Sequence, residues 1–154
     1  MVSKFRLTVW NPKVILYQMI ILQCLYYICL GILCSILARV SGHRPSINFL
    51  FDFYEMRVKD ASGMCTIIAF LLASLFISLL LWKIVERSKQ CLDFSATIHF
   101  WHLVLCVLHN LAFPSSAAWW LTMILSVAIS TGLGEYLCMR SEIKDIPIMQ
   151  PFNA

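Results

Sequence analysis

Four apolar stretches, each long enough to cross a lipid bilayer as a helix, take up most of this 154-residue chain. They cover residues 14–38, 64–85, 92–113 and 117–139. A hydrocarbon layer of ~30 Å requires roughly 20 helical residues at about 1.5 Å each, and every stretch meets that length. The sequence therefore predicts an all-α polytopic membrane protein, a compact bundle of four transmembrane helices.

The composition excludes an ordinary water-soluble domain. Apolar residues make up 60% of the chain and charged residues only 13%, whereas about a quarter of the residues of a soluble domain are charged. In water, such a chain would leave large apolar faces uncovered. Because no linker, repeat or low-complexity tract interrupts it, we expect residues 1–154 to form one membrane domain.

The basic residues predict the orientation, because cytosolic segments are enriched in Lys and Arg. Eight of them lie before the first stretch, at the end of the second, between the second and third, or after the fourth: Lys4, Arg6, Lys13, Lys83, Arg87, Lys89, Arg140 and Lys144. Four lie between the first and second stretches: Arg39, Arg44, Arg57 and Lys59. Both termini and the tail 140–154 are therefore predicted to be cytosolic, and the loop 40–63 lumenal. The net charge of +4 indicates topology and weak attraction to anionic lipid, and no nucleic-acid surface.

Two connections carry aromatic residues. Segment 48–56 of the lumenal loop mixes five aromatic or aliphatic side chains with Asp52 and Glu55, a pattern typical of either an interfacial helix or a loop packed on the bundle. The third connection is short and contains Pro114, with Trp119 and Trp120 at interfacial depth. The third and fourth spans are therefore expected to form a tight hairpin.

Small residues indicate where helices approach each other in lipid. The fourth stretch contains Ser126, Ser130 and Gly134 at intervals of four, and the second contains Ala69 and Ala73. We expect these faces to point inward, and a dimer interface on the same stripe is the competing interpretation.

The third stretch carries a polar stripe. His99, His102, Cys106 and His109 fall within an arc of roughly 80° on one helix face. A metal or haem site would need ligands that converge from facing helices, and no other predicted span contains a histidine. Together with Gln18, the three histidines are therefore predicted to form a structural stripe turned into the bundle, with no metal and no cofactor. The alternative is a small transporter or metal-binding protein that uses this stripe.

A second polar group lies near the predicted cytosolic face. It consists of three residues predicted to lie at a similar depth: Asp93, Glu135 and Gln18. They form either a cluster that fixes the order of the helices or one that shapes a docking site. In the alternative, Glu135 extends to water beside Arg140. Two boundary cysteines are candidates for packing or S-palmitoylation, namely Cys91 and Cys138. Because no nucleotide-binding, hydrolase or metalloprotease motif is present, we do not expect an enzyme.

Several sequence blocks resemble the Sys family of Golgi trafficking proteins. The most specific are KQCLDF at 89–94 and GEYLCMR at 134–140, and the likeness continues in order over nearly the whole chain. Further matching residues are Phe5, Arg6, Val9, Trp10, Pro12, Ile15, Leu16, Gln18, Thr97, His99, Phe100, His102, Leu103, Phe113, Pro114, Trp119, Trp120, Glu142, Lys144, Ile146 and Pro147.

This resemblance implies a multi-pass protein of the Golgi and trans-Golgi network that has no catalytic activity. Such a protein is the membrane receptor for an N-terminally acetylated Arf-related small GTPase, which leads in turn to recruitment of an Arf-like GTPase and of GRIP-domain golgins. Three of the matching blocks lie on the predicted cytosolic side, where the GTPase would bind. The candidate partner-binding residues are therefore Trp10, Lys89, Asp93, Glu135 and Arg140.

Overall fold

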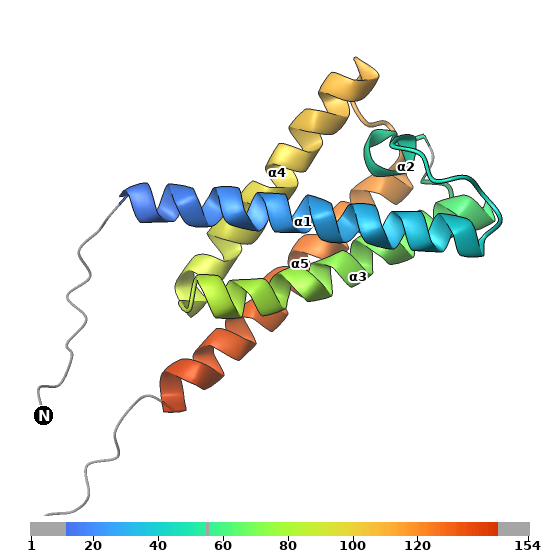
Figure 1. The fold of residues 1–154 in the computed structure, drawn as a ribbon. Coiled ribbons are helices and arrows are strands. Elements are labelled where there is room, and N and C mark those ends of the chain that lie inside the picture. The colour runs from blue at the N-terminus through green and yellow to red at the C-terminus, as the bar shows by residue number, and fades with distance from the viewer. Residues whose placement is uncertain (1–11, 55, 145–154) are drawn as a thin grey trace, which may run out of the picture.

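A computed structural model describes residues 12–54 and 56–144, and the elements of these residues are all helical (Figure 1). The long helices are α1 (Pro12–Val40), α3 (Ala61–Ile84), α4 (Cys91–Asn110) and α5 (Ala117–Lys144). A single turn, α2 (Asn48–Phe51), lies in the loop after α1, and a short 3-10 helix, η1 (Ser88–Gln90), leads into α4. All four long helices are long and apolar enough to cross a membrane, which confirms the predicted four-helix class.

The last two helices end at different places from the predicted spans. The third helix stops at Asn110, before residue 113, because Leu111 adopts a left-handed conformation with φ 51° and Pro114 disfavours helix at the residue before it. By contrast, α5 continues beyond residue 139 to Lys144. No proline occurs before Pro147 to stop it, so the end of α5 carries polar residues past the apolar stretch.

Gly42 determines where α1 ends. Its φ is +77°, a conformation that a residue without Cβ adopts at no steric cost. The N–H of Gly42 donates to Arg39 O at 3.1 Å and the N–H of His43 donates to Ala38 O at 2.8 Å. These two bonds form a Schellman motif, which satisfies carbonyl groups that the helix end would leave free.

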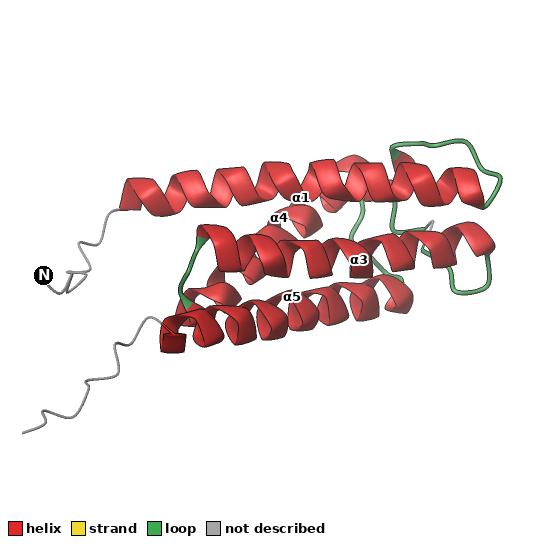
Figure 2. Ribbon diagram, turned by 60° about the horizontal axis from the view of Figure 1, so that its bottom comes forward, coloured by secondary structure: helices red, strands yellow, loops and turns green. Residues whose placement is uncertain are grey.

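The helices pack with α3 at the centre, between α1 and α5, while α4 packs mainly on α5 (Figure 2). The outer helix α1 contacts the bundle along one narrow row, formed by every fourth residue: Leu22, Tyr26, Leu30, Cys34 and Ala38. The central helix α3 is buried over a much wider face. The small residues predicted to point inward are buried within the single chain: Ala69, Ala73, Ser126, Ser130 and Gly134.

The loop between α1 and α3 packs on the bundle. Phe53 and Met56 are buried in the common core, and the amide of Asn110 at the end of α4 donates to Phe51 O at 2.8 Å. Only one helical turn forms in segment 48–56. The described residues of the segment thus pack on the bundle through Phe53 and Met56.

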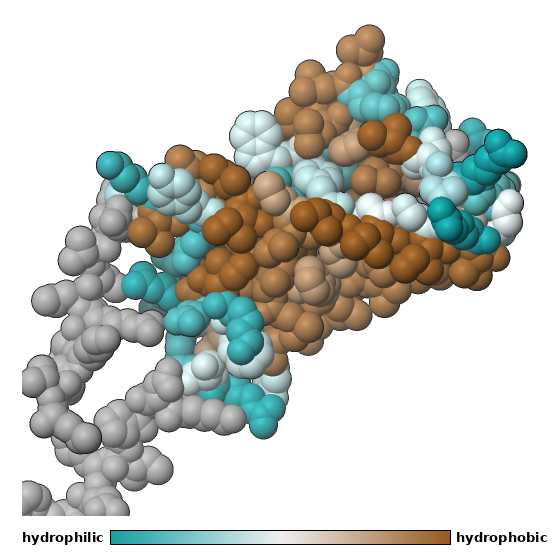
Figure 3. All heavy atoms as spheres, in the orientation of Figure 1, coloured by the Kyte–Doolittle hydropathy of each residue, from teal (hydrophilic) through white to brown (hydrophobic). Residues whose placement is uncertain are grey.

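The outer surface carries a broad apolar band with polar residues toward both ends (Figure 3). Large apolar side chains are exposed along α1, among them Ile20, Ile28, Ile32 and Ile36. In a membrane these side chains contact acyl chains, where exposure of apolar surface carries no penalty. At about 1.5 Å per residue, α1 spans roughly 43 Å, so it tilts in the bilayer or extends beyond the hydrocarbon.

Candidate docking surface at one end of the bundle

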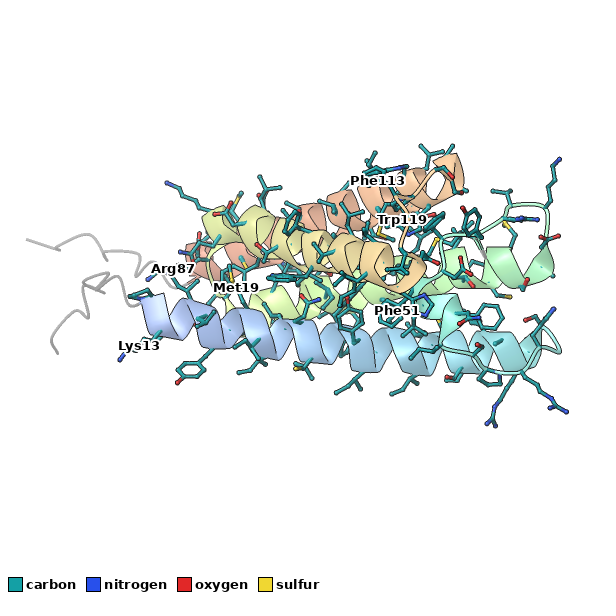
Figure 4. The ribbon with its side chains drawn as sticks, turned by 90° about the horizontal axis from the view of Figure 1, so that it is seen from above. Lys13, Met19, Phe51, Arg87, Phe113 and Trp119 are labelled. Carbon is teal, nitrogen blue, oxygen red and sulfur yellow. The ribbon has the colours of Figure 1, made fainter. Side chains whose placement is uncertain are left out.

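Three segments that are far apart in sequence meet at one end of the bundle, termed the basic end. It comprises the start of α1, the connection between α3 and α4, and the last turns of α5 (Figure 1). Lys13 and Arg87 both lie at this end (Figure 4). The amide of Gln18 donates to Ile84 O at 2.8 Å, and so joins α1 to the last turn of α3. The start of α1, the connection between α3 and α4 and the last turns of α5 therefore lie toward the same end of the bundle.

The connection between α3 and α4 is also fixed to α5. After α3, Glu86 turns the backbone with φ 55°, and η1 follows. The carboxylate of Glu142 accepts hydrogen bonds from Ser88 N at 3.1 Å and Ser88 Oγ at 3.0 Å. A negative charge at the start of a helical segment is favourable, because backbone N–H groups point toward it.

Sequence reasoning treated Glu142 only as part of a motif and missed this contact. Ser88 and Glu142 lie 54 positions apart, so no local pattern connects them. Three side chains therefore join the helices at the basic end: Gln18, Ser88 and Glu142.

Cys91 and Cys138 pack against each other where α4 and α5 meet. Both are fully buried, and their Sγ atoms lie 3.6 Å apart. Gly134 lies in the same contact, since a Cβ there would come 3.2 Å from Leu81 Cδ1 and 3.6 Å from Cys91 Sγ. These thiols are packing groups in the observed structure, because an acyl transferase could reach neither of them from the surface.

The predicted partner-binding residues divide by exposure. Lys89, Asp93 and Arg140 are exposed at the basic end, while Glu135 is half-buried beside the Gly134 contact. Trp10 lies outside the described residues. The exposed three are available to a partner, and Glu135 is better placed to affect packing.

An apolar groove runs between α1 and α4 and begins close to Asp93. Its volume is about 300 Å³. It is termed the α1–α4 groove and is lined by Leu16, Met19, Ile20, Gln23, Cys24, Phe94, Thr97, Ile98 and Trp101. Asp93, Thr97 and Trp101 are spaced by four, so they follow one face of α4 from its exposed start into the groove. Met19 lies on the side of α1 that faces α4 (Figure 4).

His102, a member of the predicted polar stripe, lies inside the bundle. It is fully buried, with Nδ1 3.3 Å from Tyr27 Oη and Nε2 3.4 Å from Cys106 Sγ. Either tautomer of a neutral imidazole can pair both nitrogens with these neighbours. Aromatic rings from four other helices surround it, contributed by Tyr26, Tyr27, Phe51, Phe70 and Trp119.

His109 does not belong to the buried stripe, contrary to the expectation. Its side chain is exposed, although its ring lies 5.8 Å from that of Phe51. His109 has nearly the same angular position on α4 as His102, but the last turns of α4 diverge from the other helices (Figure 1). Helical spacing gives the direction of a side chain and does not say whether a neighbour covers it.

The structure gives the metal alternative no site among the described residues. Within 12–54 and 56–144, no three His, Cys, Asp or Glu side chains are close enough to hold one metal ion. His99 and His102 are instead engaged with neighbouring backbone and side-chain atoms. The buried part of the stripe therefore shows hydrogen bonding and ring packing.

Comparison with known proteins places the chain in one family over nearly its whole length. Residues 5–148 match the family described as SYS1, integral membrane protein S linking to the trans Golgi network. A SYS1 homolog of Nematostella vectensis is 40% identical over 148 residues, which cover 96% of this chain and 94% of that protein. A SYS1 homolog of Dictyostelium discoideum is 38% identical over 95% of this chain and 62% of that protein.

Protein SYS1 of Saccharomyces cerevisiae is 32% identical over 136 residues, covering 88% of this chain and 66% of the yeast protein. No solved structure matches. Because a family match of this extent includes the basic end, all four long helices and the loop between α1 and α3, the chain belongs to the SYS1 family of integral membrane proteins.

Proposed function

We propose that this protein is a receptor in Golgi and trans-Golgi network membranes that recruits an Arf-related small GTPase to its basic end. Through that GTPase it leads to recruitment of an Arf-like GTPase and of GRIP-domain golgins, and so supports vesicle traffic among endosomes, Golgi and plasma membrane. Membership in a family of integral membrane proteins linking to the trans Golgi network supports the location. The receptor role is supported by one observation. Hydrogen bonds join the first part of α1, the connection between α3 and α4, and the end of α5, which all match the family, at one exposed end of the bundle.

The geometry suits recruitment better than catalysis or transport. Lys89, Asp93 and Arg140 are exposed on helices that Gln18 and Glu142 hold in register. A partner therefore meets a preformed surface, which lowers the entropic cost of binding. No observation on the described residues favours the transporter or metal-binding alternative.

The α1–α4 groove extends this surface into the membrane. An acetylated N-terminus has lost its positive charge, so the apolar end of a GTPase that carries one can enter a groove with almost entirely apolar walls. Gln23 Nε2 is buried without a partner and belongs to the groove lining. It can donate to the carbonyl of the acetyl group, which makes this groove the proposed site for the end of the GTPase.

Recruitment is tested by measuring membrane-bound GTPase per receptor molecule in cells that express variants in place of the native protein. Charge reversal of Lys89 and Arg140 together should lower this ratio about fivefold or more, since each exposed ionic contact contributes roughly 0.5–1 kcal/mol. The matched control reverses Arg39 and Arg44, which are exposed at the other end of the bundle. Equal recruitment by both double variants would exclude the basic end as the docking surface.

Three further variants test the parts of the site. Thr97→Phe fills the α1–α4 groove and should reduce recruitment without moving the receptor from the Golgi. Trp10→Ala should do the same, because Trp10 belongs to the predicted cytosolic N-terminal segment. Glu135→Gln should instead lower receptor abundance, with recruitment falling only in proportion.

A further inference from the structure

A second groove, termed the α4–α5 groove, opens toward the lipid between these two helices. Its volume is about 450 Å³, within the ~300–1,000 Å³ typical of small-molecule sites. Phe100, Trp120 and Ile124 stand along it as exposed apolar side chains, and Ala96 and Ala128 leave space at one end. It follows α4 for roughly 10 Å, from Ala96 to Leu103.

His99 is a wall residue of this groove, and its ring has an unused acceptor. It forms part of the groove wall and is only 6% exposed. Its Nδ1 lies 2.9 Å from Ser95 O, and because a carbonyl oxygen can only accept, Nδ1 carries the proton. In the neutral ring Nε2 is then the acceptor, and it is buried without a partner. A buried acceptor without a donor costs free energy, so the site favours a molecule that supplies one.

Within residues 12–54 and 56–144, no side chain donates to His99 Nε2. The hydroxyl of Tyr26 also lacks a partner and its ring lies 5.8 Å from that of His99, but the two groups do not bond. Tyr26 comes from α1 and is no part of the groove wall. The indole N–H of Trp120 is used by Pro114 O at 3.0 Å.

We propose that the α4–α5 groove binds a membrane sterol whose hydroxyl donates to His99 Nε2. None of the ten residues that line the groove is charged, so it offers nothing to a phosphate headgroup. The walls are apolar or aromatic apart from His99, which suits a flat hydrocarbon body with a single donor. Diacylglycerol and ceramide carry further ester or amide groups that would remain unpaired there.

The test uses the full chain in phosphatidylcholine nanodiscs and a photoactivatable sterol. The sterol should label residues of α4 and α5, and an unlabelled 3-hydroxysterol should displace it. The corresponding 3-ketosterol, which has no donor, should compete about tenfold more weakly, as expected for the loss of one buried hydrogen bond. Diacylglycerol or extra phosphatidylcholine should not compete.

Two variants assign the contacts. Ala128→Phe fills the groove from its exposed side and should abolish labelling, whereas Leu79→Phe, exposed on α3, should leave it unchanged. His99→Leu should retain labelling and lose the preference for hydroxysterol over ketosterol. Equal competition by the two sterols in the native protein, competition by diacylglycerol, or full labelling of the Ala128→Phe variant would each overturn the proposal. If His99→Leu does not fold, Ala128→Phe and the two competitors still decide, because Ala128 lies outside the core.

Discussion

At the scale of single residues, the two other histidines of the polar stripe, His102 and His109, differ in their surroundings. His102 lies in the core with both ring nitrogens paired, while His109 is exposed at the diverging end of α4. The same side chain on the same helix face therefore has two energetic roles. In lipid, such buried hydrogen bonds contribute modestly, roughly 0.6 kcal/mol on average, so ring packing around His102 accounts for much of its stabilising effect.

We expect His102→Gln to lower the free energy of unfolding by about 1–2 kcal/mol, because Gln keeps hydrogen-bonding capacity but loses the ring contacts. His109→Gln should change it by less than about 0.5 kcal/mol, as for an exposed site. Unfolding in mixed micelles with increasing SDS measures both. Stoichiometric metal in chelator-washed native protein, lost in the His102 variant, would show that the histidine is a ligand instead.

Gly134 and Gly132 provide a matched pair two positions apart on α5. A Cβ at Gly134 would meet Leu81 Cδ1 at 3.2 Å, whereas at Gly132 nothing lies within 4 Å. Gly134→Leu should therefore destabilise the bundle by about 1–3 kcal/mol through overpacking. Gly132→Leu should be neutral or stabilising by up to about 1 kcal/mol, since Leu favours helix more than Gly does. The same SDS titration compares them, and equal stability of the two variants would show that the contact of Gly134 with α3 does not limit the side chain at this position.

At the scale of elements, the short connection between α3 and α4 is held by side chains of α1 and α5. Gln18 of α1 binds the carbonyl of Ile84, and Glu142 of α5 binds Ser88. The bonds to Ile84 O and from Ser88 N satisfy backbone groups that helix ends leave unpaired. The connection is consequently ordered by tertiary contacts and presents Lys89 in a fixed position.

Glu142→Ala should loosen this connection without unfolding the bundle. The loss of two hydrogen bonds to a charged acceptor is expected to raise amide exchange at Ser88 and its neighbours about tenfold. Hydrogen exchange with mass spectrometry over segment 85–91 measures this. Tyr136→Ala, exposed on the same helix, should leave exchange there unchanged. If both variants exchange alike, Glu142 does not order the connection.

At the scale of the whole molecule, the bundle separates two unlike ends. The basic end carries Lys13, Arg87, Lys89 and Arg140, while the opposite end carries Arg39, Arg44, Arg57 and Lys59 and is closed by the loop whose Phe53 and Met56 reach the core. On the face shown in Figure 3, the surface between the two ends is largely apolar. This distribution fits a bilayer around the middle of the bundle.

Both chain ends are predicted to be cytosolic, because the basic residues outnumber those of the opposite side by eight to four. Tags placed before Met1 and after Ala154 should both bind antibody after the plasma membrane alone is permeabilised. A third tag inserted after Gly42, in the loop between α1 and α3, should remain protected until internal membranes are opened. Protection of either terminal tag would reverse or break the predicted topology.

The amino-acid sequence predicts the four long helices and most of their bounds. A membrane span needs only about 20 consecutive apolar residues, and this requirement can be read from one local segment. The sequence also indicated the inward face of Ser126, Ser130 and Gly134 through their regular spacing. Three features are seen only in the three-dimensional structure. The end of α4 diverges and leaves His109 exposed, the loop between α1 and α3 packs on the core, and Glu142 binds Ser88. These features depend on contacts between segments that are far apart in the chain. The sequence does not predict them, because a periodic pattern indicates the direction of a side chain but does not identify the residue that it contacts.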